Sequence, residues 1–97
     1  MIQGFRDKGT RDIYFGIASK AARATLPQPL WRIAQRKLSY LEAAAKIEDL
    51  AAPPGNCLEV LKGALAGFWS IRINEQYRII FQFLGGNAHE VEVLDYH

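Results

Sequence analysis

Three residues at the end of the sequence, Asp95, Tyr96 and His97, carry side chains that can exchange protons. Histidine has an unperturbed pKa of about 6.5, so its ring can act as an acid or as a base near neutral pH. Tyrosine, with an unperturbed pKa of about 10, needs nearby cations before it can act as a base. Because these residues follow the alternating strand-like run "VEVL", their chemistry depends on what that strand places beside them.

Basic residues are scarce in the acidic second half of the chain, which holds only Lys62, Arg72 and Arg78. If "NEQ" at 74–76 forms a hairpin loop, apolar residues pair across the two strands on one face. Arg72 then lies directly opposite Arg78 on the other face. A shift of one residue would set Arg78 opposite Ile71, so the first register is predicted.

Two arginines side by side, with Lys62 on a neighbouring strand, could form a phosphate clamp. Guanidinium groups bind phosphate oxygens in pairs and spread their charge over a transition state. Without an anion the like-charge pair is destabilising by up to about 1 kcal/mol, and the alternative is that the side chains spread into solvent. Extending the register through the "GGN" loop places Tyr96 near Arg78. Asp95 would face the other way, unless the strand ends near Leu94 and all three terminal residues turn toward the clamp.

Cations beside a phenol and an imidazole suit RNA cleavage without a metal ion, in which a 2′-hydroxyl attacks the adjacent phosphate. The motifs of other chemistries are missing: there is no phosphate-binding glycine loop, zinc-protease motif or serine nucleophile elbow. One cysteine, Cys57, and two histidines are too few for a disulfide or a closed zinc site. Cys57 is interpreted as an inert, partly buried thiol, and no metal or cofactor is expected.

The order of predicted elements indicates an α+β fold, in which an N-terminal strand and two helices pack on an antiparallel sheet of one domain, residues 1–97. "IQGF" at 2–5 predicts a short strand, and Thr10 is expected to cap a helix that continues to residue 19. The stretch at 26–52 predicts a long helix. Its expected apolar stripe is Leu30, Ala34, Leu38, Leu41 and Ala45. Further strands are predicted near 57–62, 67–73, 77–84 and 88–95.

Charge is distributed unevenly: residues 1–47 hold nine Lys or Arg and three acidic residues, whereas residues 48–97 hold three and seven. Arg32, Arg36 and Lys37 lie on the predicted long helix away from its stripe, where they are expected to bind RNA. The alternative is a solvated helix surface without a partner. No apolar run approaches the roughly 20 residues that cross a bilayer, and the first residues lack the apolar centre of a signal peptide, so a cytoplasmic protein is expected.

Four stretches together resemble the HigB-type toxins of the RelE superfamily: "IQGFRDKGT", "LEVLKG", "GFWSIRINEQYRIIFQF" and "VEVLDYH". The resemblance covers nearly the whole chain. It implies a compact RelE-like fold, ribosome-dependent cleavage of mRNA, no cofactor, no membrane, and a HigA-type helix-turn-helix antitoxin through which the toxin associates with operator DNA. By position, it implies that Lys62 and Arg78 bind the scissile phosphate and that Asp95, Tyr96 and His97 supply the catalytic groups.

The sequence departs from that family pattern at two places. Glu59 stands where some members carry a histidine, and it is interpreted as structural. "ALAG" follows "LKG" where many members continue with "DR", which removes an arginine that could contact RNA. Two alternatives therefore stay open: a ParE-like toxin that inhibits gyrase, and a catalytically weakened module that only binds an antitoxin.

Overall fold

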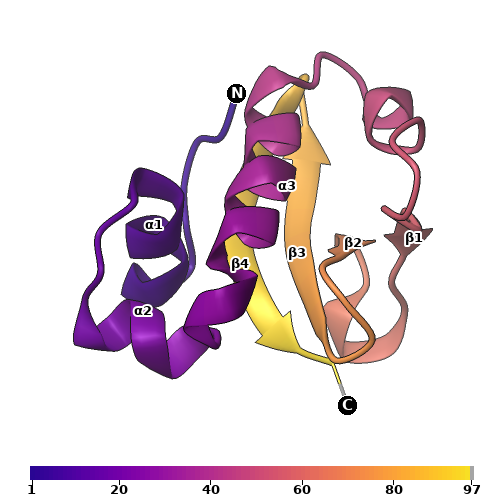
Figure 1. Ribbon diagram of the computed structural model, residues 1–97. Helices are drawn as coiled ribbons and strands as arrows, with labels where there is room; N and C mark the ends of the chain where they lie inside the picture. Colours follow the sequence, from indigo (N-terminus) through magenta and orange to yellow (C-terminus); the bar gives the residue numbers. More distant parts are fainter. Residues whose placement is uncertain (97) are drawn as a thin grey trace.

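The computed structural model describes residues 1–96 as an α+β fold, with helices packed on one face of a four-stranded antiparallel sheet (Figure 1). The elements are the α-helices α1 (Lys8–Phe15), α2 (Lys20–Thr25) and α3 (Trp31–Ala43), the 3₁₀ helices η1 (Gln28–Leu30), η2 (Ile47–Leu50) and η3 (Gly63–Leu65), and the strands β1 (Glu59–Val60), β2 (Trp69–Arg72), β3 (Tyr77–Leu84) and β4 (Asn87–Asp95). The predicted fold class is confirmed. Within residues 1–96, no helix is long and apolar enough to cross a membrane.

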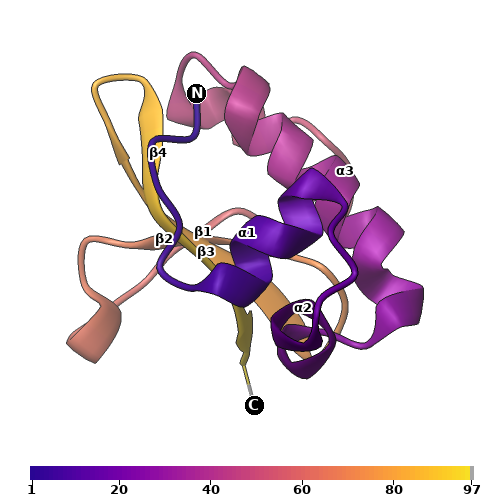
Figure 2. The ribbon, with the colours of Figure 1, turned by 90° about the vertical axis from the view of Figure 1, so that its left-hand side faces the viewer.

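The strand order β1-β2-β3-β4 follows the chain, and the N-terminal segment runs along the outer edge of β4 (Figures 1 and 2). This segment makes two isolated parallel bridges, Ile2 with Ala88 and Phe5 with Val91. The strand expected at residues 2–5 is therefore reduced to bridges. The reason lies in β4, which carries a bulge at Glu90 (φ 55°) between the two bridge positions and so interrupts a continuous ladder.

The hairpin of β2 and β3 has the predicted register. Ile71 lies opposite Ile79 and Arg72 lies opposite Arg78. The turn is closed by Asn74, whose side-chain oxygen accepts hydrogen bonds from the backbone nitrogens of Gln76 (2.9 Å) and Tyr77 (2.8 Å). An asparagine that bonds the backbone two and three residues later favours a tight turn, so the "NEQ" loop sets the register locally.

The main core lies between α3 and the sheet. The fully buried residues of this layer are Ala34, Leu38 and Leu41 from α3 and Ile71, Ile79, Phe81 and Val91 from the sheet. The long helix was predicted wrongly at both ends: its start is the separate η1, and α3 ends at Ala43. The carboxylate of Asp49 accepts hydrogen bonds from the backbone nitrogens of Ala45 (2.9 Å) and Lys46 (3.2 Å), which turns the chain into η2 and leaves Ala45 exposed.

The first helix begins earlier than expected, because Asp7 and not Thr10 is its N-cap. The Asp7 carboxylate accepts a hydrogen bond from the Thr10 backbone nitrogen at 3.0 Å. Thr10 is buried, and its hydroxyl oxygen accepts a hydrogen bond from the Val93 nitrogen at 2.9 Å, which ties α1 to β4. α1 ends at Gly16, and Ser19 then caps α2, a helix that the sequence did not predict.

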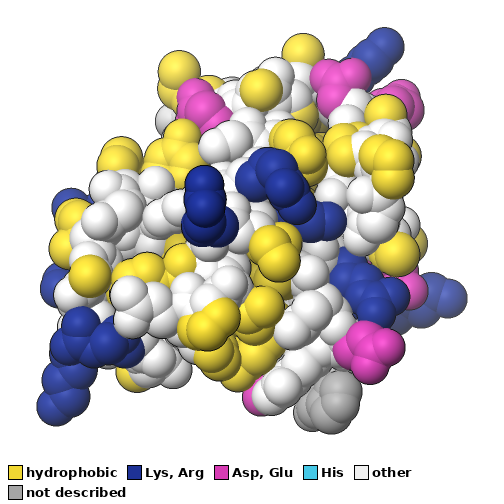
Figure 3. All heavy atoms as spheres, in the orientation of Figure 1, with side chains coloured by type: hydrophobic (Ala, Val, Ile, Leu, Met, Phe, Trp, Pro, Cys, Tyr) yellow, Lys and Arg dark blue, Asp and Glu magenta, His cyan; other side chains and the backbone are white. Residues whose placement is uncertain are grey.

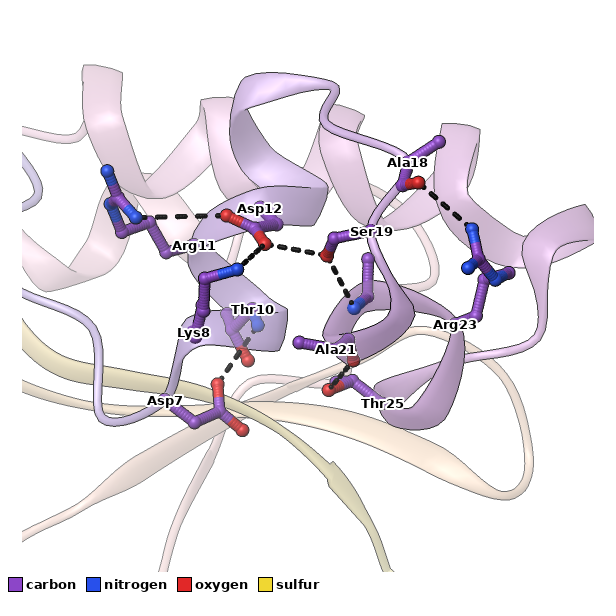
Figure 4. Close-up of polar contacts among 11 residues, drawn as sticks. Asp7, Lys8, Thr10, Arg11, Asp12, Ala18, Ser19, Ala21, Arg23 and Thr25 are labelled. Carbon is purple, nitrogen blue, oxygen red and sulfur yellow. Dashed lines mark hydrogen bonds and ion pairs between the residues drawn. The ribbon is translucent and has the colours of Figure 1, made fainter.

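One buried carboxylate joins the first two helices (Figure 4). Asp12 is 1% exposed, and it accepts a 2.6 Å hydrogen bond from the Ser19 hydroxyl while Lys8 lies 3.3 Å away. The hydrogen bond from Ser19, aided by Lys8 and Arg11, holds the pKa of Asp12 below its usual value although burial acts in the opposite direction. The same helices also approach closely at Gly9, where a Cβ atom would collide with the side chain of Thr25.

The low pKa of Asp12 predicts an acid-sensitive fold. A carboxyl group whose pKa is lowered on folding stabilises the protein fully above its unfolded pKa of about 3.9, and this contribution is lost as the pH falls through the lower, folded value. Asp12→Asn should therefore lower the urea midpoint at neutral pH and flatten its dependence on pH below about 4. Ser19→Ala should flatten the pH dependence less, because Lys8 remains, but it should also lower the midpoint at every pH because it removes the N-cap of α2. Equal pH dependence in the parent and in Asp12→Asn would contradict this assignment.

Candidate active site on the open face of the sheet

All three α-helices cover one face of the sheet, and η3 projects on the other side (Figure 2). Since side chains alternate along a strand, the residues that neighbour the buried Ile71 and Ile79 point away from the helices. We call this side the open face because the three α-helices lie on the other side. It carries Glu59, Ser70, Arg72, Arg78 and Ile80, of which Ser70 and Ile80 are buried. The pairing of Glu59 with Ser70 and of Ser70 with Ile80 places these strands side by side across it.

Arg78 lies on the inner strand β3, at the hairpin end of the open face, and three side chains contact it. Its Nη1 donates a hydrogen bond to the Ser70 hydroxyl at 3.2 Å and lies 3.7 Å from a carboxylate oxygen of Glu59. Its guanidinium carbon lies 5.1 Å from the ring centre of Tyr96. With 19% of its side chain exposed, Arg78 keeps contact with solvent while its orientation is fixed from three sides.

Arg72 lies opposite Arg78 in the ladder, as the register predicted. Its nearest carboxylate is that of the exposed Glu75, at 3.9 Å. Each arginine of the pair therefore has one carboxylate at the outer limit of an ion pair, which reduces the repulsion between them.

Lys62 was expected on a strand, but it lies just after β1, at the start of η3. It is exposed, and only three positions separate it from Glu59, the partner of Arg78. The loop of residues 61–68 that carries Lys62 is closed at its base by a hydrogen bond from the Leu61 nitrogen to the Phe68 carbonyl at 2.9 Å. Lys62 therefore lies on a loop beside the open face and is not part of a strand of the sheet.

The C-terminal residues meet the hairpin turn. Asp95 ends β4 opposite Tyr77, and its carboxylate accepts a hydrogen bond from the side chain of Gln76 at 3.0 Å. The Tyr96 nitrogen donates to the Gln76 carbonyl at 2.8 Å. Tyr96 thereby lies against Arg78, as the strand register predicted, while Asp95 is turned to the hairpin loop. His97 lies outside the described residues.

Two of the three helix residues expected to bind RNA face solvent. Arg32 and Arg36 are exposed, and Figure 3 shows Lys and Arg side chains over α3. The expectation for Lys37 was wrong: it is 6% exposed, and its ammonium group donates a 2.8 Å hydrogen bond to the side chain of the fully buried Asn56. Lys37 lies one turn from Ala34 and from Leu41, so it belongs to the edge of the core stripe. Desolvation, followed by the nearby Arg36, lowers the pKa of Lys37.

The structure adds residues that sequence reasoning missed. Glu59 was interpreted as structural, and the structure places its carboxylate 3.7 Å from Arg78. Nothing in the sequence marked Ser70 and Gln76, because their roles follow from strand pairing.

Cys57 is exposed and adopts a positive φ of 49°, contrary to the expected partly buried thiol. Within residues 1–96, no three His, Cys, Asp or Glu residues gather closely enough to hold a metal ion.

The overall arrangement also occurs in a solved structure. The structure superposes on the YoeB-YefM complex from Staphylococcus aureus with a TM-score of 0.59 at 15% sequence identity, covering 100% of this chain and 98% of the other. The sequence comparisons are more specific. Residues 3–97 match a sequence model described as a RelE-like toxin of the type II toxin-antitoxin system HigB.

Two relatives agree with that match. Toxin HigB-1 of Vibrio cholerae is 40% identical over 84 residues, which is 87% of this chain and 85% of the relative. Endoribonuclease HigB of Proteus vulgaris is 34% identical over 98 residues and is aligned over the full length of both chains. The chain therefore belongs to the HigB-like family of RelE-like toxins. As a toxin of a type II toxin–antitoxin family, it has an antitoxin as its partner.

The burial of Lys37 predicts a structural role. Lys37→Met keeps an unbranched side chain one atom shorter but leaves the Asn56 side-chain oxygen without its donor, which should cost about 1 to 3 kcal/mol of unfolding free energy. The matched variant Arg36→Met, one position earlier and exposed, should change it by no more than about 0.5 kcal/mol. Urea denaturation measures both. An unchanged midpoint for Lys37→Met would mean that its ammonium group is solvated, as first expected.

Proposed function

We propose that the chain is an endoribonuclease that cleaves mRNA on the ribosome by attack of the 2′-hydroxyl on the adjacent phosphate, without a metal ion. The observation that carries this proposal is the environment of Arg78. Its guanidinium group is oriented by Ser70 and Tyr96, faces solvent, and has a second arginine opposite it in the ladder. Donors fixed before the substrate arrives stabilise developing negative charge without reorganisation.

In this mechanism Arg78 and Lys62 bind the scissile phosphate, and Arg72 binds the backbone beside it. The 2′-oxygen forms a bond to phosphorus while the bond from phosphorus to the 5′-oxygen breaks, which leaves a 2′,3′-cyclic phosphate. A base must take the proton of the 2′-hydroxyl, and an acid must give one to the departing 5′-oxygen. The cations stabilise the extra negative charge of the five-coordinate phosphorus between these steps.

The acid and the base are assigned from the groups around Arg78. Glu59 and Tyr96 both contact its guanidinium group, so either side chain would lie beside a phosphate bound there. We assign the base to Glu59, because a carboxylate accepts a proton without first losing one. His97 is assigned as the acid. Asp95, which Gln76 holds, is assigned the role of orienting the segment that carries Tyr96 and His97.

The partners follow from the same proposal. We propose a HigA-type helix-turn-helix antitoxin, association with operator DNA through that antitoxin, and the ribosome with its mRNA as the target, all in the cytoplasm, with residues 1–97 acting as one toxin domain. Arg32 and Arg36 on the exposed side of α3 are proposed to contact ribosomal RNA. If they do, reversing both to Glu should weaken co-sedimentation with ribosomes, and an unchanged fraction would exclude this contact.

Two rival functions make different demands on the open face. A gyrase-inhibiting toxin needs a protein-binding surface, and an inactive antitoxin-binding module needs no oriented phosphate site. Ser70 and Glu59 hold the Arg78 cation in one orientation. A nuclease uses such an oriented cation and neither rival function needs it, so these contacts favour the nuclease. The loop sequence "ALAG" after Lys62 keeps the weakened module as the second candidate.

Brief expression without an antitoxin should arrest growth and cut translated mRNA, leaving 2′,3′-cyclic or 3′-phosphate ends. Arg78→Lys should slow cleavage by about 100-fold, because a lysine cannot offer the same forked donors to a phosphate. Arg72→Lys is the matched variant from the facing strand, and it should have a smaller effect. Mapping of mRNA ends distinguishes the rivals: intact mRNA with broken DNA points to gyrase inhibition, and intact mRNA with normal growth points to the binding module.

The acid and base assignments predict different pH profiles. Glu59→Gln should slow cleavage by about 100-fold to 10,000-fold and remove the rise of kcat with pH on the acidic side. His97→Gln should slow it on the same scale and remove the fall of kcat on the alkaline side. Single-turnover cleavage on programmed ribosomes measures both. If Glu59→Gln keeps the acidic limb, the base is Tyr96 and the assignment of Glu59 is wrong.

A further inference from the structure

The loop of residues 61–68 carries Lys62 but has few attachments of its own. Its backbone hydrogen bonds join loop residues to one another: Leu61 to Phe68, Leu65 to Lys62, Ala66 to Gly63 and Phe68 to Leu65. Gly63 and Gly67 lie within it with φ angles of 66° and 93°, a region of backbone conformation that favours glycine. A cation on such a loop binds a phosphate well only if something else fixes where the loop lies.

Arg6 supplies an attachment from the opposite end of the sequence. Its guanidinium carbon lies 5.5 Å from the ring centre of Phe68, at the base of the loop. The same group lies 3.8 Å from a carboxylate oxygen of Glu90 and 3.7 Å from one of Glu92, both on β4. One side chain thus links the outer strand of the sheet to the residue that closes the Lys62 loop.

The backbone around Arg6 is itself fixed. Its nitrogen donates to the Val91 carbonyl at 2.9 Å, and the Val91 nitrogen donates to the Gly4 carbonyl at 3.0 Å. The bulge at Glu90 lies beside these bonds and belongs to the same part of β4. Arg6 lies beside two carboxylates, those of Glu90 and Glu92, whereas Arg78 lies beside the carboxylate of Glu59. The two negative charges leave Arg6 poorly suited to bind a phosphate. Within residues 1–96, its contact with the Phe68 ring is the other directed interaction of its side chain.

We propose that Arg6 is a positioning residue, which acts through Phe68 to hold the loop of residues 61–68 and thereby places Lys62 for the substrate phosphate. The role of Lys62 toward a phosphate rests on the proposed function, whereas the hold of Arg6 on the loop is independent of it. Arg6 is not proposed to contact the phosphate or the reacting groups, so its effect on cleavage depends on the position of Lys62.

A double-mutant cycle tests that route. Cleavage of mRNA on programmed ribosomes is measured for the parent, Arg6→Gln, Lys62→Ala and the double variant. Loss of a cation–π contact with its orienting effect should slow the parent by about 3-fold to 30-fold. In the Lys62→Ala background the same change should have no further effect, because the residue that Arg6 positions is gone. Equal slowing in both backgrounds would overturn the proposal.

Hydrogen exchange tests the loop directly and needs no activity. The amides of residues 61–68 should exchange faster in Arg6→Gln, also by about 3-fold to 30-fold, while those of α3 stay unchanged. Phe68→Leu, which keeps an apolar side chain but removes the ring face, should reproduce this pattern. Arg6→Lys should keep most of the protection. Unchanged exchange of the loop in Arg6→Gln would overturn the proposal.

Arg11 offers a matched control on a different surface. Its guanidinium carbon lies 6.0 Å from the ring centre of Phe15, and its Nη1 lies 3.8 Å from a carboxylate oxygen of Asp12. Arg11→Gln removes the same kind of contact far from Lys62 in the chain and should leave both cleavage and loop exchange at parent values. If the parent itself does not cleave RNA, the proposed function fails, and the exchange results alone decide whether Arg6 holds the loop.

Discussion

The pairing of β2 with β3 determines both the core and the candidate site. Because side chains alternate along a strand, setting Ile71 opposite Ile79 beneath the helices also sets Arg72 opposite Arg78 on the open face. Burying each isoleucine contributes about 1.5 to 3 kcal/mol, whereas the facing arginines cost up to about 1 kcal/mol. Burial therefore dominates, and the like-charge pair is a consequence of the same register that builds the core.

Local patterns in the sequence predicted that register correctly. They also pointed to the toxin family, and the comparisons confirm it. They were insufficient at the start of α1, where two residues could serve as the cap. Asp7 and Thr10 are both good N-cap types. The choice is made by Val93, which uses the Thr10 hydroxyl from 83 positions away, and no local pattern contains that information.

Lys37 and Asn56 illustrate the same limit inside the core. A lysine at the edge of an apolar stripe usually turns its charged end to water. Here Asn56 donates to the Leu50 carbonyl, accepts from Lys37, and its own backbone carbonyl accepts from the Arg72 nitrogen at 2.7 Å. One buried asparagine thus satisfies groups from three segments through its side chain and its backbone. Glu59 also acquires its place beside Arg78 only when β1 pairs with β2, so its relevance follows from the sheet and not from composition.

The two cations proposed to share a phosphate differ in their freedom of movement. Arg78 belongs to β3, which is hydrogen-bonded to a strand on each side, whereas Lys62 belongs to a loop bonded mainly to itself. A central strand opens only with the fold, but a loop of this kind fluctuates on its own. The charge of Arg78 is therefore held in one place by the sheet, whereas the charge of Lys62 moves with its loop.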